Sequence, residues 1–315
     1  MSTPDLVPLR RERPSAEVRR WVGDALGGRV VATRWLKGGI SAATRIVVVE
    51  RPDGTTTKAV LRRFVNEGWL AVEPELATRE AAVLEALEAH GVAAPRLLAV
   101  DGDGSASGSV CLLQTLEPGR PLHHVRPGYA DELVAALLRV HEVPPIPGLR
   151  DQVARLDQDV QHPTPRRFGF DVDARVWAEV ARLWPTVERR PSTLVHDDYH
   201  PGNVLWHRGH LSSIVDWTTA AVGQPAADVC YLGLDVSLVL GLEHGDEVHA
   251  AHQRLTGAPL PDRTFWDLFA AARAVGVVDQ WWGSYVEFGR ADLTLATVEA
   301  RLDAFVDRAL SWSSR

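Results

Sequence analysis

Hydrophobic positions in the first third of the chain change from helical to strand spacing. Residues 15–28 carry an amphipathic helical pattern that opens on Ser15, a preferred N-cap, and ends on two glycines. The turn Asp53-Gly54 is a strong hairpin signal between two stretches rich in β-branched residues. We therefore expect one helix and then three strands, over residues 29–36, 44–50 and 57–64.

A second helical pattern interrupts this strand-rich part. Residues 75–91 place apolar side chains and Glu80 on one face, and Gly91 marks the end of the helix. Two further strands are predicted over residues 95–101 and 109–116, joined by a turn rich in Gly and Ser. The first third of the chain is thus predicted to be a small sheet with one main helix.

The pattern becomes mainly helical after the turn Pro118-Gly119, which we interpret as the domain boundary. The prediction is an N-terminal domain of residues 1–116 and a C-terminal domain of residues 117–315. The fold class is then α+β, with a small β-rich lobe and a larger, mostly helical lobe. Helical spacing covers residues 129–143, 173–184, 265–289 and 296–311, and short strand-like stretches occur at 194–196, 203–206 and 212–217.

Composition narrows the class of protein. The chain has 315 residues, of which 45% are hydrophobic and 24% charged, ordinary values for a folded globular protein. Its formal net charge is −7 without a long basic run, so we expect no nucleic-acid partner, whereas a cationic partner is compatible. Cys111 and Cys230 lie far apart in apolar sequence, which is typical of buried thiols in a reducing compartment. Because no stretch is typical of a signal sequence or a membrane span, we expect a cytoplasmic protein without a membrane partner.

Candidate chemistry lies in the stretch LVHDDYHPGNVLW, residues 194–206. His196, Asp198 and Asn203 stand as H-x-D-x-x-x-x-N, the spacing of a kinase catalytic loop. In phosphoryl transfer an anionic side chain positions the attacking hydroxyl and accepts its proton, while oxygen ligands hold Mg²⁺ against the phosphates. The spacing favours Asp198 for the first task and Asn203 for the second.

This chemistry requires a second metal ligand, a carboxylate, and Asp216 is the candidate. Asp216 ends the second strand of a predicted hairpin whose first strand begins at Asn203. Such a hairpin would return Asp216 to a position beside Asn203. The two segments together are more specific than either one alone.

The same segments resemble the aminoglycoside phosphotransferase family, which has a two-lobed protein-kinase-like fold. The matching motifs are H-x-D-x-H-P-G-N at residues 196–203, hydrophobic-D-W at residues 215–217 and G-x-P-x-x-D at residues 223–228. The resemblance extends over nearly the whole sequence.

This resemblance implies an enzyme that transfers the γ-phosphate of ATP, or of GTP, to a hydroxyl of a small molecule with the help of Mg²⁺. Asp198 is then the catalytic base, and Asn203 and Asp216 are the metal ligands. The N-terminal domain becomes the nucleotide-binding lobe. The C-terminal domain holds the catalytic loop, the metal site and the acceptor site.

A loop between the first two strands carries residues that suit a phosphate. Gly38 and Gly39 would let backbone approach the nucleotide, and Ser41 offers a hydroxyl. Such a turn is by itself also typical of a plain hairpin. The family often has Gly-Gly-x-Ser-Asn, whereas Ala42 follows Ser41 here, so one loop contact departs from the pattern.

Arg62 and Glu80 are the predicted counterparts of the strand lysine and the helix glutamate of kinases. Arg62 can bind a phosphate in a bidentate manner, and its neighbour Arg63 points to the opposite face of the strand. Glu80 is also compatible with an ordinary solvated helix position. Adenine is expected along the backbone from Gln114 to Leu116, at the end of the last strand.

Other polar residues near the motif are expected to support the loop. His196 and His200 are interpreted as hydrogen-bonding residues that hold it, and Asp228 as an acid that bonds its backbone. Asp197 stands where the family often has Gly, and we expect it to face solvent.

The acceptor is expected in the helical lobe, and its identity stays open. The candidate substrate residues are Asp235, Asp279, Trp282 and Tyr285. An acidic pocket would suit a cationic acceptor such as an aminoglycoside or an amino alcohol, whereas an aromatic lining would suit an apolar scaffold such as a macrolide. Helices this rich in aromatic residues are, however, more often core than ligand platforms.

The leading interpretation is a kinase that acts on an aminoglycoside or another antibiotic. A kinase of a small metabolite, such as an amino alcohol, an amino acid or a sugar, is the first alternative. A nucleotide-binding pseudokinase is the second, and the set Asp198, Asn203 and Asp216 argues against it. A metal phosphohydrolase that uses His196-Asp197 as a ligand doublet is the third, and it would need further ligands on helices.

Overall fold

The structure is a computed structural model that describes residues 11–36, 42–161, 174–275, 278–287 and 289–313. The chain divides into two compact units. The first unit comprises Met1–Pro118 together with Ile214–Thr218, and the second comprises Gly119–Ser213 and Thr219–Arg315. A short segment from the second half of the sequence therefore belongs to the N-terminal unit.

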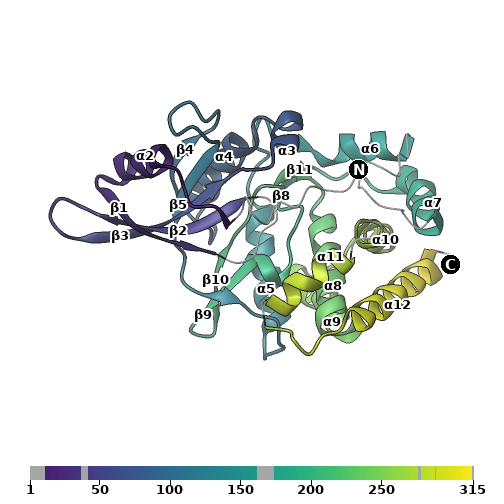
Figure 1. Ribbon diagram of the computed structural model, residues 1–315. Helices are drawn as coiled ribbons and strands as arrows, with labels where there is room; N and C mark the ends of the chain where they lie inside the picture. The colour runs from purple at the N-terminus through teal and green to yellow at the C-terminus, as the bar shows by residue number, and fades with distance from the viewer. Residues whose placement is uncertain (1–10, 37–41, 162–173, 276–277, 288, 314–315) are drawn as a thin grey trace. The chain divides into compact units, whose positions relative to one another are not determined.

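The first unit is built on a five-stranded sheet with the strand order β1-β2-β3-β5-β4, in which every neighbouring pair is antiparallel. Figure 1 shows its strands in purple to teal, together with helices α2 and α4. Its elements are α2 (Ala16–Leu26), β1 (Arg29–Trp35), β2 (Ala43–Glu50), β3 (Thr56–Arg63), α3 (Glu67–Val72), α4 (Leu76–Ala89), β4 (Leu97–Asp101) and β5 (Cys111–Thr115).

Local sequence signals explain the ends of α2. The Ser15 hydroxyl accepts a hydrogen bond from the Val18 amide at 3.1 Å, and Gly27 closes the helix with a left-handed φ of 68°. The apolar face of α2 packs on alternate residues of the central strands, among them Val47 and Leu61. This packing forms the core of the first unit.

Helix α4 buries the face that its sequence pattern marks. Its buried residues include Leu84, Leu87 and, among them, the acidic Glu80. The Glu80 side chain meets Arg62, which neighbours Leu61 on β3. Because successive strand residues point to opposite faces, α4 reaches the face of β3 that α2 does not cover.

The second unit combines two small sheets with a large helical core. One sheet has the order β10-β9-β6 and the other β7-β11-β8. The elements are β6 (Arg120–Pro121), α5 (Tyr129–His141), β7 (Arg150–Asp151), α6 (Gln152–Gln161), α7 (Ala174–Leu183), η1 (Trp184–Thr186), β8 (Thr193–Val195), η2 (Pro201–Asn203), β9 (Val204–His207), β10 (His210–Ile214), β11 (Ala221–Gly223), α8 (Pro225–Leu240), α9 (Leu242–Thr256), α10 (Arg263–Ala274), α11 (Val278–Glu287) and α12 (Leu295–Ser313).

Helix α8 lies at the centre of the second unit. It is buried from Ala226 to Val239, because α9, α10 and α12 pack around it (Figure 1). A helix that is apolar on all sides is typical of such a central position. The positions of its few polar residues, including Asp228 and Asp235, are therefore set by the core.

Several elements differ from the sequence-based prediction. The helical pattern of residues 265–289 forms two helices, α10 and α11, and α3 was not anticipated. Strand β10 ends at Ile214, so Asp216 follows the strand instead of ending it, and its φ of 63° turns the chain there. None of the described helices combines the length and the apolar character that crossing a bilayer requires.

Candidate active site

The candidate catalytic loop lies between β8 and β9. Apolar residues anchor both ends, since Leu194, Val195 and Val204 are fully buried. Between them, Pro201 begins the short turn η2, and the His200 ring nitrogen Nδ1 accepts a hydrogen bond from the Gly202 amide at 3.1 Å. The Pro-Gly turn and its histidine cap thus fix the direction in which the chain enters β9.

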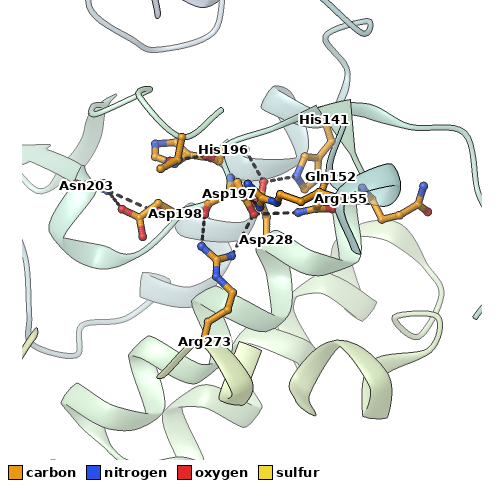
Figure 2. Close-up of polar contacts among 11 residues, drawn as sticks. His141, Gln152, Arg155, His196, Asp197, Asp198, Asn203, Asp228 and Arg273 are labelled. Atoms are coloured by element: carbon orange, nitrogen blue, oxygen red, sulfur yellow. Dashed lines mark hydrogen bonds and ion pairs between the residues drawn. The ribbon is translucent and has the colours of Figure 1, made fainter. Parts of the chain in front are cut away.

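Asn203 is held against Asp198 by this turn. Its side-chain Nδ2 donates to the Asp198 carbonyl oxygen at 3.0 Å and to Asp198 Oδ2 at 3.3 Å. Figure 2 shows Asp198 turned toward Asn203. The His200 Nε2 atom lies 3.9 Å from the same carboxylate oxygen. The loop therefore presents a partly exposed carboxylate whose orientation an amide fixes.

Asp228 supports the loop from the first turn of α8. Its Oδ2 accepts a hydrogen bond from the His196 amide at 2.8 Å, and its Oδ1 accepts one from the Asp197 amide at 2.9 Å. The His141 Nε2 atom lies 3.1 Å from Oδ2 (Figure 2). A buried carboxylate with two backbone donors and an imidazole satisfies the polar groups that the loop buries.

The prediction that Asp197 faces solvent is wrong. Its side chain is buried, and both carboxylate oxygens have partners. Gln152 and Arg273 donate to Oδ1 at 2.9 and 3.1 Å, and Arg155 donates to Oδ2 at 3.0 Å. Burial alone would raise the pKa of Asp197, but the guanidinium groups of Arg273 and Arg155 outweigh it and hold this pKa below its usual value.

These three partners were also missed by sequence reasoning. Arg155 and Arg273 lie 42 and 76 residues from Asp197, and nothing in the local pattern of either helix distinguishes them from ordinary surface arginines. One available signal was Asp197 itself, because an acid at a position that favours glycine needs a compensating contact.

The first unit holds a second buried group of charges around Arg62. The Arg62 Nη2 atom lies 2.6 Å from Asp216 Oδ1, and its Nε atom lies 3.4 Å from Glu80 Oε2. Thr218 accepts from Arg62 at 2.6 Å and donates to Asp216 Oδ1 at 2.8 Å. Burial is the main cause that raises the pKa of Glu80 to about 7, against the opposing effect of Arg62. Glu80 is therefore no solvated helix residue.

The residues predicted as metal ligands carry the oxygen atoms that Mg²⁺ prefers. Asn203 directs its amide nitrogen to Asp198, which leaves the amide oxygen as the atom that it can offer to a cation. The Asp216 side chain is one-fifth exposed and presents a carboxylate. Each residue by itself thus offers an oxygen atom of the kind that a hard divalent cation takes as a ligand.

A different group of ligand types lies inside the helical core. Among the described residues, Cys230, His249 and Asp267 bring one ligand atom each to within 4.8 Å of one another, and all three are buried. Asp267 already lies 3.1 Å from the Arg263 guanidinium and 3.4 Å from His249. The ion pair with Arg263 and the approach of His249 thus already occupy the Asp267 carboxylate.

The remaining residues predicted to bind the nucleotide are Gly38, Gly39, Ser41, Gln114 and Leu116. Gly38, Gly39 and Ser41 lie outside the described residues. Gln114 lies inside β5, buried and paired with Val60 of β3. Leu116 directly follows the end of β5 and is half-buried.

The predicted substrate residues do not form one surface. Tyr285 is buried and donates to Asp235 Oδ2 at 2.7 Å, and burial is the main cause that raises the pKa of Asp235. Trp282 packs against the helical core and donates from Nε1 to the Leu293 carbonyl at 2.7 Å. Asp279 is exposed. The aromatic residues of α11 thus belong mainly to the core.

Known proteins resemble this chain in sequence pattern and in fold. The model of the phosphotransferase enzyme family matches residues 33–274. No curated protein matches the chain in sequence. Solved structures of similar fold include a thermostable mutant of aminoglycoside phosphotransferase APH(4)-Ia in ternary complex with ADP and hygromycin B, at 17% identity and a TM-score of 0.61, covering 93% of this chain and 99% of that chain.

Two further solved structures of similar fold are phosphotransferases named for other acceptors. The macrolide 2′-phosphotransferase MphH from Brachybacterium faecium has 20% identity and a TM-score of 0.54, covering 92% of this chain and 98% of that chain. An aminoglycoside-3′-phosphotransferase of type VIII has 16% identity and a TM-score of 0.55, covering 82% and 100%. The predicted α+β two-lobed kinase-like fold and the family resemblance are both confirmed. Because the family model spans most of the sequence, the chain belongs to the phosphotransferase enzyme family.

Proposed function

We propose that the protein transfers the γ-phosphoryl group of ATP to a hydroxyl of a small molecule, with Asp198 as the base. The observation that carries this proposal is the pairing of Asp198 with Asn203 on one loop, at 3.3 Å between Oδ2 and Nδ2. Phosphoryl transfer needs an anionic acceptor of this kind, held in one orientation and open to the substrate.

In the proposed reaction the acceptor hydroxyl donates its hydrogen bond to the Asp198 carboxylate. The hydroxyl oxygen forms a bond to the γ-phosphorus, the bond from that phosphorus to the bridging oxygen breaks, and ADP leaves. The hydroxyl proton passes to Asp198. A Mg²⁺ ion with oxygen ligands from Asn203 and Asp216 would neutralise phosphate charge when bound.

Arg62 is proposed to bind a nucleotide phosphate. Its guanidinium group is buried and held by Glu80 and Asp216, so its position is fixed before nucleotide binds. An arginine can replace the usual lysine in this task because its planar group presents several donors to phosphate oxygens. The loop with Gly38, Gly39 and Ser41, and the backbone from Gln114 to Leu116, are proposed to complete nucleotide binding.

The contacts of Asp197 do not support the alternative that the protein is a metal phosphohydrolase. Both of its carboxylate oxygens accept hydrogen bonds from cationic or amide groups, so neither is directed toward a metal ion. A pseudokinase transfers no phosphoryl group, so it would not need the pairing of Asp198 with Asn203.

The second unit contains a cavity that we propose for the acceptor. Its volume is about 610 Å³, within the range of small-molecule sites. For His123, one of the lining residues, burial and then the charge of His200 on the candidate catalytic loop lower the pKa to about 4. The cavity is lined by Pro121, Leu122, His123, His124, Val125, Leu240, Gly289, Arg290 and Asp292.

The charges of this lining favour a neutral acceptor over a polycationic one. Among the described residues of the lining the one acid is Asp292, which lies 2.7 Å from the Arg290 guanidinium, so these residues carry no surplus negative charge to attract several ammonium groups. We therefore propose a hydroxylated scaffold with few amines. Macrolides and sugars fit this description better than aminoglycosides such as hygromycin B, and better than amino alcohols or amino acids.

The test is a panel of acceptors incubated with MgATP and read by mass for an added phosphoryl group. The panel contains a macrolide, hygromycin B, a second aminoglycoside, an amino alcohol and neutral sugars. Phosphorylation of one acceptor, and its absence with heat-inactivated protein, is the expected result. Tight MgATP binding without turnover of any acceptor would instead favour the pseudokinase alternative.

A further inference from the structure

The residue next to the proposed base has an unusual backbone conformation. Asp197 has a φ of 59°, in the left-handed region that favours glycine. A residue with a Cβ atom stays there only where surrounding contacts compensate for the strain. The contacts of Asp197 are therefore expected to determine the shape of the loop that carries Asp198.

Four groups from three helices hold Asp197. Its carboxylate accepts from Gln152 and Arg155 of α6 and from Arg273 of α10. The Arg273 Nη2 atom also donates to the Asp197 carbonyl oxygen at 2.6 Å, and the Asp197 amide donates to Asp228 on α8 (Figure 2). Amide, carbonyl and side chain are thus all fixed.

Arg273 connects this arrangement to the neighbouring residue. The carbonyl that it binds belongs to the peptide group joining Asp197 to Asp198, so the plane of that peptide is set by the guanidinium. Arg273 itself lies over the ring of Tyr231, with 4.5 Å from its Cζ atom to the ring centroid. Its planar group donates from Nη1 to the carboxylate and from Nη2 to the carbonyl, a geometry that the single nitrogen of a lysine would not reproduce.

Gln152 is fixed in turn by a tight backbone approach. Its Oε1 atom accepts from the Gln224 amide at 3.1 Å while its Nε2 atom donates to Asp197. A Cβ atom at Gly223 would lie 2.5 Å from Oε1, so only glycine leaves space for this side chain. The glycine of the G-x-P-x-x-D motif therefore has a physical connection to the catalytic loop.

We propose that Asp197 is a positioning residue, which orients Asp198 through Arg155, Arg273 and Gln152. The inference rests on the proposed function, because it concerns the geometry of the proposed base. A wrong orientation of Asp198 by about 1 Å can reduce turnover up to about a hundredfold while nucleotide binding persists. The effect should therefore appear in kcat and leave KM for MgATP nearly unchanged.

The test compares Asp197→Asn with the wild-type protein and with Asp303→Asn, which removes an exposed carboxylate on α12. Amide hydrogen exchange is measured for peptides covering residues 194–204 and for peptides of α12. We expect faster exchange in the loop and unchanged exchange in α12. Because the measurement needs no turnover, it stays informative even if the wild-type protein phosphorylates no acceptor, a result that would count against the proposed function alone.

Kinetics with the best acceptor of the panel provide the second readout. Asp197→Asn is expected to lower kcat about tenfold to a hundredfold with little change in KM for MgATP, and Asp303→Asn to change neither. If Asp197→Asn does not fold, Arg155→Gln replaces it, since the Arg155 side chain is 30% exposed and its truncation is expected to disturb folding less. Unchanged loop exchange, or a full kcat, in the folded variant would overturn the proposal.

Discussion

The Nε atom of Arg62 lies 3.4 Å from Glu80 Oε2, and both side chains are almost completely withdrawn from solvent. A buried ion pair of this kind costs desolvation of both groups, so its partners depend on each other. The same guanidinium also contacts Asp216. Strand β3, helix α4 and the segment Ile214–Thr218 are joined by one side chain.

Removal of this side chain should destabilise the protein strongly. In Arg62→Met, Glu80 and Asp216 lose their common cation, and we expect a loss of about 3–5 kcal/mol in the free energy of unfolding at pH 8. Urea denaturation measures this change. The matched control is Arg34→Met, which removes an exposed arginine of β1 and should cost less than about 0.5 kcal/mol. Equal effects of the two substitutions would contradict the assigned role of Arg62.

Glu80 should make stability depend on pH. Because burial raises its folded pKa to about 7, above the usual 4.5, folding is favoured by protonated Glu80. This contribution is fully present below pH 4.5 and is lost as pH rises through about 7. The Glu80→Gln variant has no titratable group at position 80. Its free energy of unfolding should therefore fall less between pH 5 and pH 8 than that of the wild-type protein.

The comparison is made by denaturant unfolding of both proteins at the two pH values. Since all other groups titrate alike, the difference between the two slopes reports on Glu80. Identical pH dependence in both proteins would show that Glu80 keeps an ordinary pKa.

The apolar face of α4 should determine the stability of the first unit. Leu84 is fully buried there, and Leu84→Ala is expected to cost about 2–5 kcal/mol through lost burial and a residual cavity. Glu85→Ala, on the exposed side of the same helix, serves as the control and should change stability by less than about 0.5 kcal/mol. A small effect of Leu84→Ala in thermal or urea unfolding would argue against this packing.

Local sequence patterns predicted much of the fold, because helix caps and apolar helix faces depend mainly on residues that are close in the sequence. Ser15 caps α2 as expected, and the predicted face of residues 75–91 is the buried face of α4. The division of residues 265–289 into two helices was missed, since the apolar spacing continues through the break. Short strands such as β7 and β11 leave too few residues for a pattern to show.

The candidate site was predictable where its residues share one short segment. Asp198 and Asn203 are five positions apart, and the intervening turn brings them into contact. Asp197 was misjudged because its environment comes from α6 and α10, whose arginines approach only in the folded chain. Its burial is a tertiary property that no local spacing records.

The proposed mechanism depends most on Asp198, and the substitution Asp198→Asn tests this role directly. The substitution keeps the size of the side chain but removes the proton acceptor, so kcat for phosphoryl transfer should fall about a hundredfold to ten-thousandfold. The dissociation constant of MgATP should stay close to that of the wild-type protein, and Asp303→Asn should retain full activity. Phosphorylation of the acceptor at the wild-type rate by Asp198→Asn would contradict the proposed mechanism.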